Sequence, residues 1–173
     1  LLLIYVIRLH ENSNGFTPIL IIKNNFMANT IWLMGLSGAG KTTLANELKK
    51  SLNDYVLIDG DELRKSLCND LGFSDIDRTE NIRRAVAVCK LLNDQGVNVI
   101  ATLMTPTHAQ QQLVLYALKL NVFMVYVNAD IKTCIYRNTK GLYSDRTRNV
   151  VGLDLPFDIP NSHFKVDTVN NNV

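Results

Sequence analysis

The sequence has few cysteines, no long apolar run and no excess of charge of either sign. Its three cysteines, at positions 68, 89 and 134, are too far apart to form a CxxC or Cys/His ligand spacing. This pattern indicates neither a disulfide framework nor a zinc site, and it is typical of proteins kept reduced in the cytoplasm. The apolar residues 1–9 are too few to span a bilayer and lack the basic region of a signal peptide, so we expect no membrane partner.

The balanced charge also limits the partners that the protein can bind. Charged residues make up 20% of the 173 residues and the formal net charge is +2, so no broad basic surface is expected to bind nucleic acid. Apolar residues make up 47%, which is enough for one domain with a sizeable core. We expect residues 27–173 to form that domain, and residues 1–26 to be an N-terminal extension of unknown role.

From residue 30 onward, short apolar runs alternate with longer stretches of helical periodicity. This order is typical of α/β proteins in which a parallel sheet carries helices on both faces. The predicted strands cover residues 31–34, 55–58, 97–103 and 122–127. The predicted helices cover residues 42–52, 62–71, 79–93, 108–118 and 131–138.

A phosphate-binding motif follows the first predicted strand. The segment Gly35-Leu-Ser-Gly-Ala-Gly-Lys-Thr42 matches GxxxxGK[ST] and leads into a predicted helix, which is the context that the motif requires. Its glycines let backbone N–H groups turn toward an anion, and the start of the helix adds a positive dipole end. We expect Lys41 to reach the β- and γ-phosphates of ATP and Thr42 to bind Mg²⁺. The predicted nucleotide contacts are Gly35, Ser37, Gly38, Ala39, Gly40, Lys41, Thr42 and Thr43.

These features predict a P-loop nucleotide kinase-like fold with a five-stranded parallel sheet and helices on both faces. The phosphate loop alone does not distinguish a kinase from a GTPase or a motor ATPase. The second predicted strand ends in Asp59-Gly-Asp61-Glu-Leu-Arg64, and carboxylates at the carboxyl end of such a strand face the ligand crevice. Asp61 is our candidate to orient an acceptor hydroxyl, take its proton and share Mg²⁺. For Asp59, a role in the site and a structural role as the cap of the next helix are equally expected. Arg64 either binds an acceptor phosphate or is solvated.

Five consecutive motifs resemble the signatures of the adenylylsulfate kinase family. After the phosphate loop and Asp59-Gly-Asp-Glu-Leu-Arg64 come Asp70-Leu-Gly-Phe-Ser74, Asp77-Arg-Thr-Glu-Asn-Ile-Arg-Arg84 and Lys140-Gly-Leu-Tyr143. The resemblance implies a homodimeric enzyme that transfers the γ-phosphate of ATP to the 3′-hydroxyl of adenosine 5′-phosphosulfate (APS), giving PAPS. A guanine-binding Asn-Lys-x-Asp motif, which a GTPase would need, follows no later strand.

The resemblance also implies roles for individual residues. Arg64, Arg78 and Asn81 would hold the phosphosulfate and sugar of the acceptor, and Phe73 would stack on its base. Thr105, Lys140, Leu142 and Tyr143 would border the same pocket, and Arg137 would lie near the base of ATP. Lys41, Asp61 and Arg64 are the predicted catalytic residues. From the lid that follows residue 139, Arg146 or Arg148 would meet the γ-phosphate, and one of Arg83 and Arg84 would face the site.

Two segments depart from the family pattern. After the third strand, Met104-Thr-Pro-Thr-His-Ala-Gln-Gln-Gln112 keeps a hydroxyl and the proline but lacks the usual arginines. We expect His108 in this segment to be an exposed helix residue rather than a base. The lid over residues 144–154 is short, and Val150 stands in place of a phenylalanine that closes over the acceptor base. A lost stacking partner costs about 1–3 kcal/mol per base.

The shortened lid leaves two alternatives to APS phosphorylation. The acceptor could be a cytidine diphosphoramidate-type nucleotide used in surface-polysaccharide modification, because a smaller pyrimidine suits a pocket with one aromatic wall. The chain could also be a nucleotide-binding protein without transferase activity. An acceptor screen distinguishes these cases.

Overall fold

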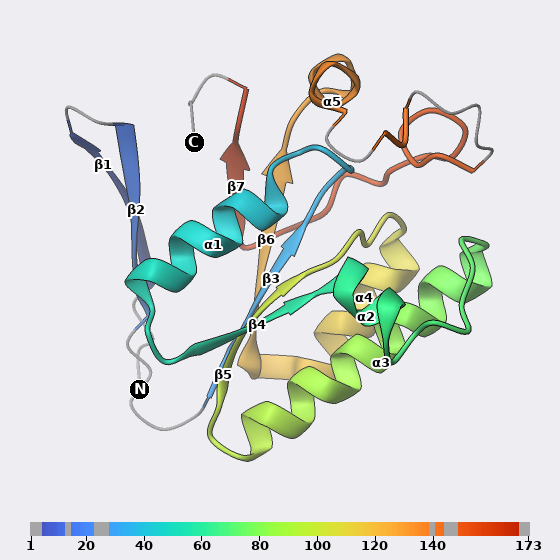
Figure 1. The fold of residues 1–173 in the computed structure, drawn as a ribbon. Helices are drawn as coiled ribbons and strands as arrows, with labels where there is room; N and C mark the ends of the chain where they lie inside the picture. Colours follow the sequence, from blue (N-terminus) through green and yellow to red (C-terminus); the bar gives the residue numbers. More distant parts are fainter. Residues whose placement is uncertain (1–4, 13–14, 23–27, 139–140, 144–148, 170–173) are drawn as a thin grey trace.

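A parallel β-sheet forms the centre of the protein. The computed structural model describes residues 5–12, 15–22, 28–138, 141–143 and 149–169 (Figure 1). Within this part of the chain, the sheet consists of five strands, which are β3 (Thr30–Met34), β4 (Tyr55–Asp59), β5 (Asn98–Thr102), β6 (Val122–Asn128) and β7 (Phe164–Asp167). Their spatial order is β4-β5-β3-β6-β7, and every neighbouring pair is parallel. The predicted five-stranded parallel sheet is therefore confirmed.

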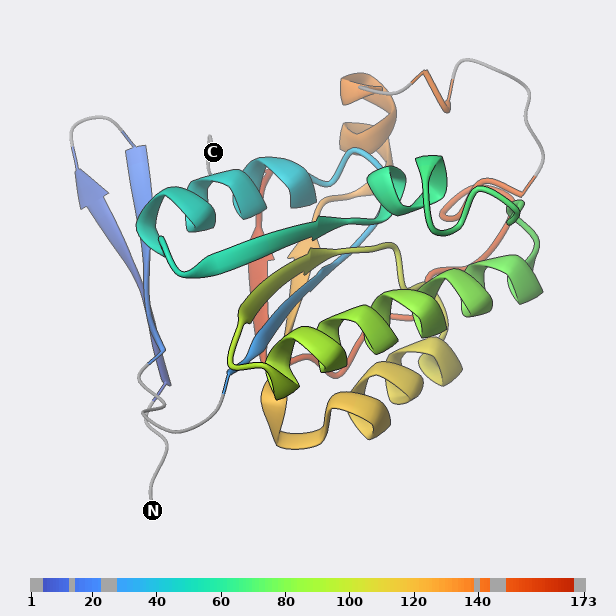
Figure 2. The same ribbon diagram turned by 60° about the horizontal axis from the view of Figure 1, so that its bottom comes forward.

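Helices cover both faces of this sheet. They are α1 (Lys41–Ser51), α2 (Gly60–Lys65), α3 (Asp75–Asp94), α4 (His108–Leu118) and α5 (Ile131–Arg137), with the 3₁₀ turn η1 at Lys119–Asn121. The helix α1 lies on one face, and α3 and α4 lie on the other (Figures 1 and 2). Alternation along the central strand β3 explains the two cores: Ile31 and Leu33 pack with α1, whereas Trp32 and Met34 pack with α3 and α4.

Residues near the N-terminus form an antiparallel hairpin outside the main sheet. It consists of β1 (Tyr5–Asn12) and β2 (Gly15–Ile22), which pair only with each other among the described strands. Both views show the hairpin beside α1 (Figures 1 and 2). No strands were predicted for this segment from the sequence.

Most predicted elements differ from the observed ones by one or two residues, but three differences are larger. The helix α3 begins at Asp75, four residues before the predicted start, because the hydroxyl of Ser74 accepts a hydrogen bond from the N–H of Asp77 and caps the helix. The helix α2 ends at Lys65, well before the predicted end at residue 71. The strand β7 was not placed by the sequence analysis, because four residues give too little periodicity.

Two sequence expectations about the environment can be compared with the structure. All three cysteines are free and buried, and the sequence had indicated no disulfide framework. In the described part of the chain, every helix is too short or too polar to pass through a bilayer.

The buried Trp32 gives a test of the core. Its indole Nε1–H donates to the hydroxyl of Thr105 at 2.9 Å, and both side chains are fully buried. We expect Thr105→Val to lower the free energy of unfolding by about 1–3 kcal/mol, because it leaves a buried donor without an acceptor. Thr105→Ser keeps the hydroxyl and should lose less. Urea unfolding measures both, and equal stability of Thr105→Val and the unaltered protein would contradict the prediction.

Candidate active site

The phosphate loop joins β3 to α1 at the carboxyl edge of the sheet (Figure 1). Gly35 is required by a close approach, because a Cβ atom there would collide with the carbonyl oxygen of Val127 on β6. Gly38 has a φ of 77° and would place a Cβ atom 3.0 Å from the carbonyl oxygen of Cys134 in α5. Packing against two neighbouring elements therefore holds the loop in a conformation that side chains would disrupt.

Lys41 lies over the loop that precedes it. Its ammonium group donates to the carbonyl oxygens of Gly35 at 2.9 Å and Leu36 at 2.8 Å. The side chains of Ser37 and Ala39 are buried, so these two predicted contacts can serve through their backbone. A cation beside backbone amides at the start of α1 forms a site suited to phosphate.

Asp59 connects the phosphate loop with the acceptor side. Its Oδ2 atom accepts hydrogen bonds from Thr42 at 3.1 Å and from Thr102 on β5 at 2.7 Å. Its Oδ1 atom accepts from the N–H of Asp61 at 2.9 Å and caps α2. The predicted capping role is present, but the contact with Thr42 was missed. The position of Asp59 at the end of a strand was the signal in the sequence that could have indicated this contact.

Asp61 follows in the first turn of α2, where its side chain is exposed at the predicted edge of the sheet. The structure thus places Asp59 in contact with Thr42. Burial lowers the pKa of the Arg64 guanidinium, and the nearby carboxylate of Asp61 offsets part of this decrease. The charges of Asp61 and Arg64 therefore attract each other at this edge of the sheet.

The oxygen atoms around Thr42 fit a magnesium ion. A hydroxyl and the carboxylates of Asp59 and Asp61 are hard ligands of the kind that Mg²⁺ prefers. In the part of the chain that the structure describes, no group of three or more His, Cys, Asp or Glu side chains could hold a metal. A magnesium ion bound here would take most of its coordination from phosphate oxygens and water, as is usual for Mg²⁺ in phosphoryl transfer.

The predicted acceptor residues Arg64, Phe73 and Arg78 lie together. The ring of Phe73 is 60% exposed, and the guanidinium carbons of Arg64 and Arg78 lie 4.5 Å and 5.6 Å from its centroid. Cation–π attraction favours this arrangement. An exposed aromatic ring beside two cations can stack on a base and bind anionic oxygens.

Backbone carbonyls hold both guanidinium groups in place. Arg64 donates to the carbonyl oxygens of Leu71 and Gly72 at 3.3 Å and 2.7 Å. Arg78 donates to Phe73 at 3.0 Å and to Asn149 at 2.9 Å. Burial lowers the pKa of both groups, but arginine stays charged in proteins. The cations are therefore positioned before any ligand arrives.

Asn81 lies one turn after Arg78 on α3. It is 6% exposed, and its side-chain oxygen accepts no hydrogen bond from the described residues. A buried acceptor of this kind calls for an explanation, and a ligand hydroxyl or amine would provide one.

The other residues singled out in the sequence differ in their exposure. Thr105 is fully buried with its hydroxyl bonded to Trp32, so the structure does not bring it to the cleft as predicted; a buried and a cleft-facing hydroxyl look alike in sequence. His108 is exposed, as expected. Val150 is 4% exposed, and Leu142 is partly buried. Lys140, Arg146 and Arg148 lie outside the described residues.

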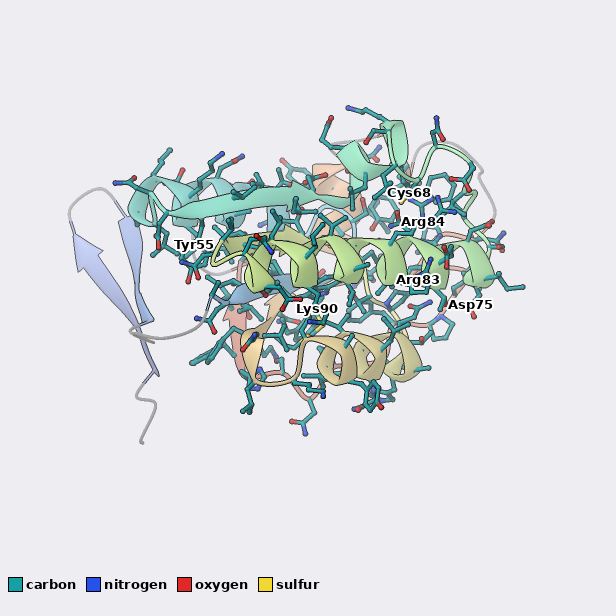
Figure 3. All side chains as sticks on the ribbon, turned by 90° about the horizontal axis from the view of Figure 1, so that it is seen from below. Tyr55, Cys68, Asp75, Arg83, Arg84 and Lys90 are labelled. Carbon is teal, nitrogen blue, oxygen red and sulfur yellow. The ribbon has the colours of Figure 1, made fainter. Side chains whose placement is uncertain are left out.

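Arg83 and Arg84 both form ion pairs in this conformation, although the side chain of Arg83 is 60% exposed. Arg84 forms an ion pair with Asp70 at 2.6 Å and donates to the carbonyl oxygen of Leu67 at 2.9 Å. Arg83 pairs with Glu80 at 2.6 Å. Figure 3 shows both arginines on α3, with Arg84 toward Cys68 in the turn after α2. Arg84 therefore fixes the turn that precedes the acceptor residues.

Arg137 and Tyr143 both contact the phosphate loop. Arg137 donates to the carbonyl oxygen of Gly38 at 3.3 Å, and the hydroxyl of Tyr143 donates to Ser37 at 2.9 Å. Thr168, which the sequence analysis did not single out, donates to Ala39 at 2.8 Å. The predicted positions of Arg137 near the ATP base and Tyr143 beside the acceptor are not tested by these contacts.

A phosphate loop after a central strand, with paired arginines and carboxylates at the same edge of a parallel sheet, defines a P-loop kinase. The sequence matches the family described as adenylylsulphate kinase over residues 27–167. It is 44% identical to an adenylyl-sulfate kinase of Prochlorococcus marinus (80% of this chain, 74% of the relative) and 39% identical to one of Marinobacter nauticus (83% and 77%). The chain therefore belongs to the adenylylsulphate kinase family.

A solved structure agrees with this assignment. The APS kinase of Mycobacterium tuberculosis, solved in complex with AMPPNP and APS, superposes with a TM-score of 0.78 and 32% sequence identity. The match covers 82% of this chain and 88% of that chain. The resemblance that the motifs indicated is therefore confirmed, and so is the predicted fold class.

Glu80 provides a test of the arrangement on α3. Hydrogen bonds from Arg83 and then Arg84 lower the pKa of its carboxyl from 4.5 to about 2. Because the folded state favours the ionised form, its stabilising contribution is complete above pH 4.5 and is lost as the pH falls toward 2. The loss of stability caused by Glu80→Gln should therefore be larger at pH 6 than at pH 3, as measured by urea unfolding.

The matched control for this measurement is Glu62→Gln, which removes an exposed ion pair with Lys65. Such pairs contribute little, so the control should cost less than Glu80→Gln at pH 6. A Glu80→Gln effect that does not change between pH 6 and pH 3 would contradict the prediction.

Proposed function

We propose that this protein transfers the γ-phosphoryl group of ATP to the 3′-hydroxyl of APS, giving PAPS and ADP. The observation that carries the proposal is the continuous set of hydrogen bonds from Thr42 through Asp59 to the N–H of Asp61. These bonds join the phosphate loop directly to the start of α2, so both substrates can meet at one edge of the sheet. Membership of the adenylylsulphate kinase family supports this assignment.

The residues on the donor side mainly position and neutralise charge. Lys41 and the loop amides bind the triphosphate, while Thr42, Asp59 and Asp61 are the residues that would hold Mg²⁺. A bound Mg²⁺ would neutralise the charge that develops on the phosphates during transfer. Asp61, which is exposed in the first turn of α2, would orient the acceptor hydroxyl in line with the γ-phosphate and take its proton.

The residues on the acceptor side recognise a nucleotide that carries extra anionic oxygens. Arg64 and Arg78 present guanidinium groups beside the Phe73 ring, which suits a phosphosulfate next to a base. Asn81 offers its buried oxygen to the sugar or base. Val150 is 4% exposed and supplies no second aromatic wall, so base stacking depends on Phe73 alone among these residues.

An assay with purified protein, ATP, Mg²⁺ and APS tests the proposal. We expect PAPS and ADP in equal amounts, and we expect Lys41→Ala to lower the rate by orders of magnitude while the circular dichroism spectrum stays the same. Phosphorylation of cytidine diphosphoramidate without turnover of APS would show that the cytidine nucleotide, and not APS, is the acceptor. ATP binding by calorimetry with no product from either nucleotide would show a binding protein without transferase activity.

We propose further that the protein works as a homodimer, as the family resemblance implies. It acts in the cytoplasm, where its three free cysteines stay reduced. Residues 1–26 are an extension of the kinase domain, because the family match begins at residue 27.

A further inference from the structure

Five consecutive backbone carbonyls of the phosphate loop each accept a hydrogen bond from a side chain. Lys41 donates to the first two, those of Gly35 and Leu36. Side chains from outside the loop donate to the next three. Tyr143 donates to the carbonyl of Ser37, Arg137 to that of Gly38, and Thr168 to that of Ala39. The carbonyl of the next residue, Gly40, begins the backbone hydrogen bonds of α1.

This arrangement follows from what a phosphate loop must do. To bind an anion, successive N–H groups have to point into one concavity. The carbonyl groups of the same peptide units then point away from it, into the protein. Buried carbonyls without a donor cost free energy, so the binding conformation needs donors behind the loop.

The three outer donors come from two separate segments of the chain, and two of them also bond each other. Arg137 ends α5, Tyr143 follows it and Thr168 follows β7. Arg137 also donates to the hydroxyl and the carbonyl oxygen of Thr168, at 3.1 Å and 2.6 Å. Thr168 is 3% exposed, so water cannot readily replace its hydroxyl.

The hydroxyl of Tyr143 is a donor at any pH at which the protein works. Burial raises the pKa of this phenol to about 12. It therefore keeps its proton, and the bond to Ser37 is present across the neutral range.

We propose that Arg137, Tyr143 and Thr168 are positioning residues for nucleotide binding, and that they act from behind the phosphate loop by holding its carbonyls so that its amides face the triphosphate. The inference rests on the proposed function only in taking ATP as the donor. It assigns Arg137 and Tyr143 to the loop backbone in addition to their predicted places near the base and the acceptor. It also assigns a role to Thr168, which no motif in the sequence indicated.

Calorimetric titration with AMPPNP and Mg²⁺ tests this proposal without any acceptor. Thr168→Val keeps the shape of the side chain and removes the donor, whereas Thr168→Ser keeps the donor. Tyr143→Phe removes one hydroxyl. Its matched control is Tyr136→Phe on α5, because the side chain of Tyr136 is 91% exposed.

We expect Thr168→Val and Tyr143→Phe each to weaken AMPPNP binding by about 3- to 10-fold, as the loss of one hydrogen bond predicts. Thr168→Ser and Tyr136→Phe should bind as the unaltered protein does. In Thr168→Val, the KM for ATP should rise by a similar factor, while the KM for the acceptor stays within about 2-fold, which a general loss of structure would not produce.

Unaltered affinity in Thr168→Val and Tyr143→Phe would overturn the proposal. Equal losses of AMPPNP affinity in Thr168→Ser and Thr168→Val would also overturn it. So would a loss of affinity in Thr168→Val and Tyr143→Phe that is proportional to the decrease in their unfolding midpoints. If AMPPNP binding changes as expected but APS is not phosphorylated, the positioning role stands and the proposed function fails.

Discussion

The phosphate loop has to satisfy two opposite demands with the same few peptide units. Its N–H groups must converge on an anion, and its carbonyl groups must find donors on the protein side. Gly35 permits the close approach to β6 that this requires, and Lys41 and Thr168 donate at the two ends of the loop. Because the donors come from α1, from α5 and from the residues around Tyr143 and Thr168, the binding conformation depends on the folded core and not on the loop alone.

The parallel sheet explains why donor and acceptor residues meet. Strands β3, β4 and β5 end at the same edge, so the loop after β3 lies beside the carboxylate that ends β4. Asp59 uses both carboxylate oxygens there, one for Thr42 and Thr102 and the other for the start of α2. A single side chain thereby fixes the distance between the phosphate loop and the helix that carries Asp61.

The sequence predicted the parts of the site that are contiguous motifs. Lys41 and Thr42 belong to one short pattern, and Phe73 with Arg78 was carried by the family resemblance. Contacts between distant segments could not be predicted, because no spacing relates Thr168 to Ala39 across 129 positions. The same holds for Thr105, whose hydroxyl serves Trp32 in the core. The strand β7 was missed for a local reason, since it is short and only partly buried.

The most direct test of the account is an NMR titration of the ¹⁵N-labelled protein with AMPPNP and Mg²⁺. The backbone amides of residues 38–42 should show the largest chemical-shift changes, since these groups are the proposed ligands of the triphosphate. AMP, which lacks the β- and γ-phosphates, should leave most of these shifts unchanged. Shift changes that bypass these amides, or equal changes with AMP, would contradict the claim that the loop backbone binds the triphosphate.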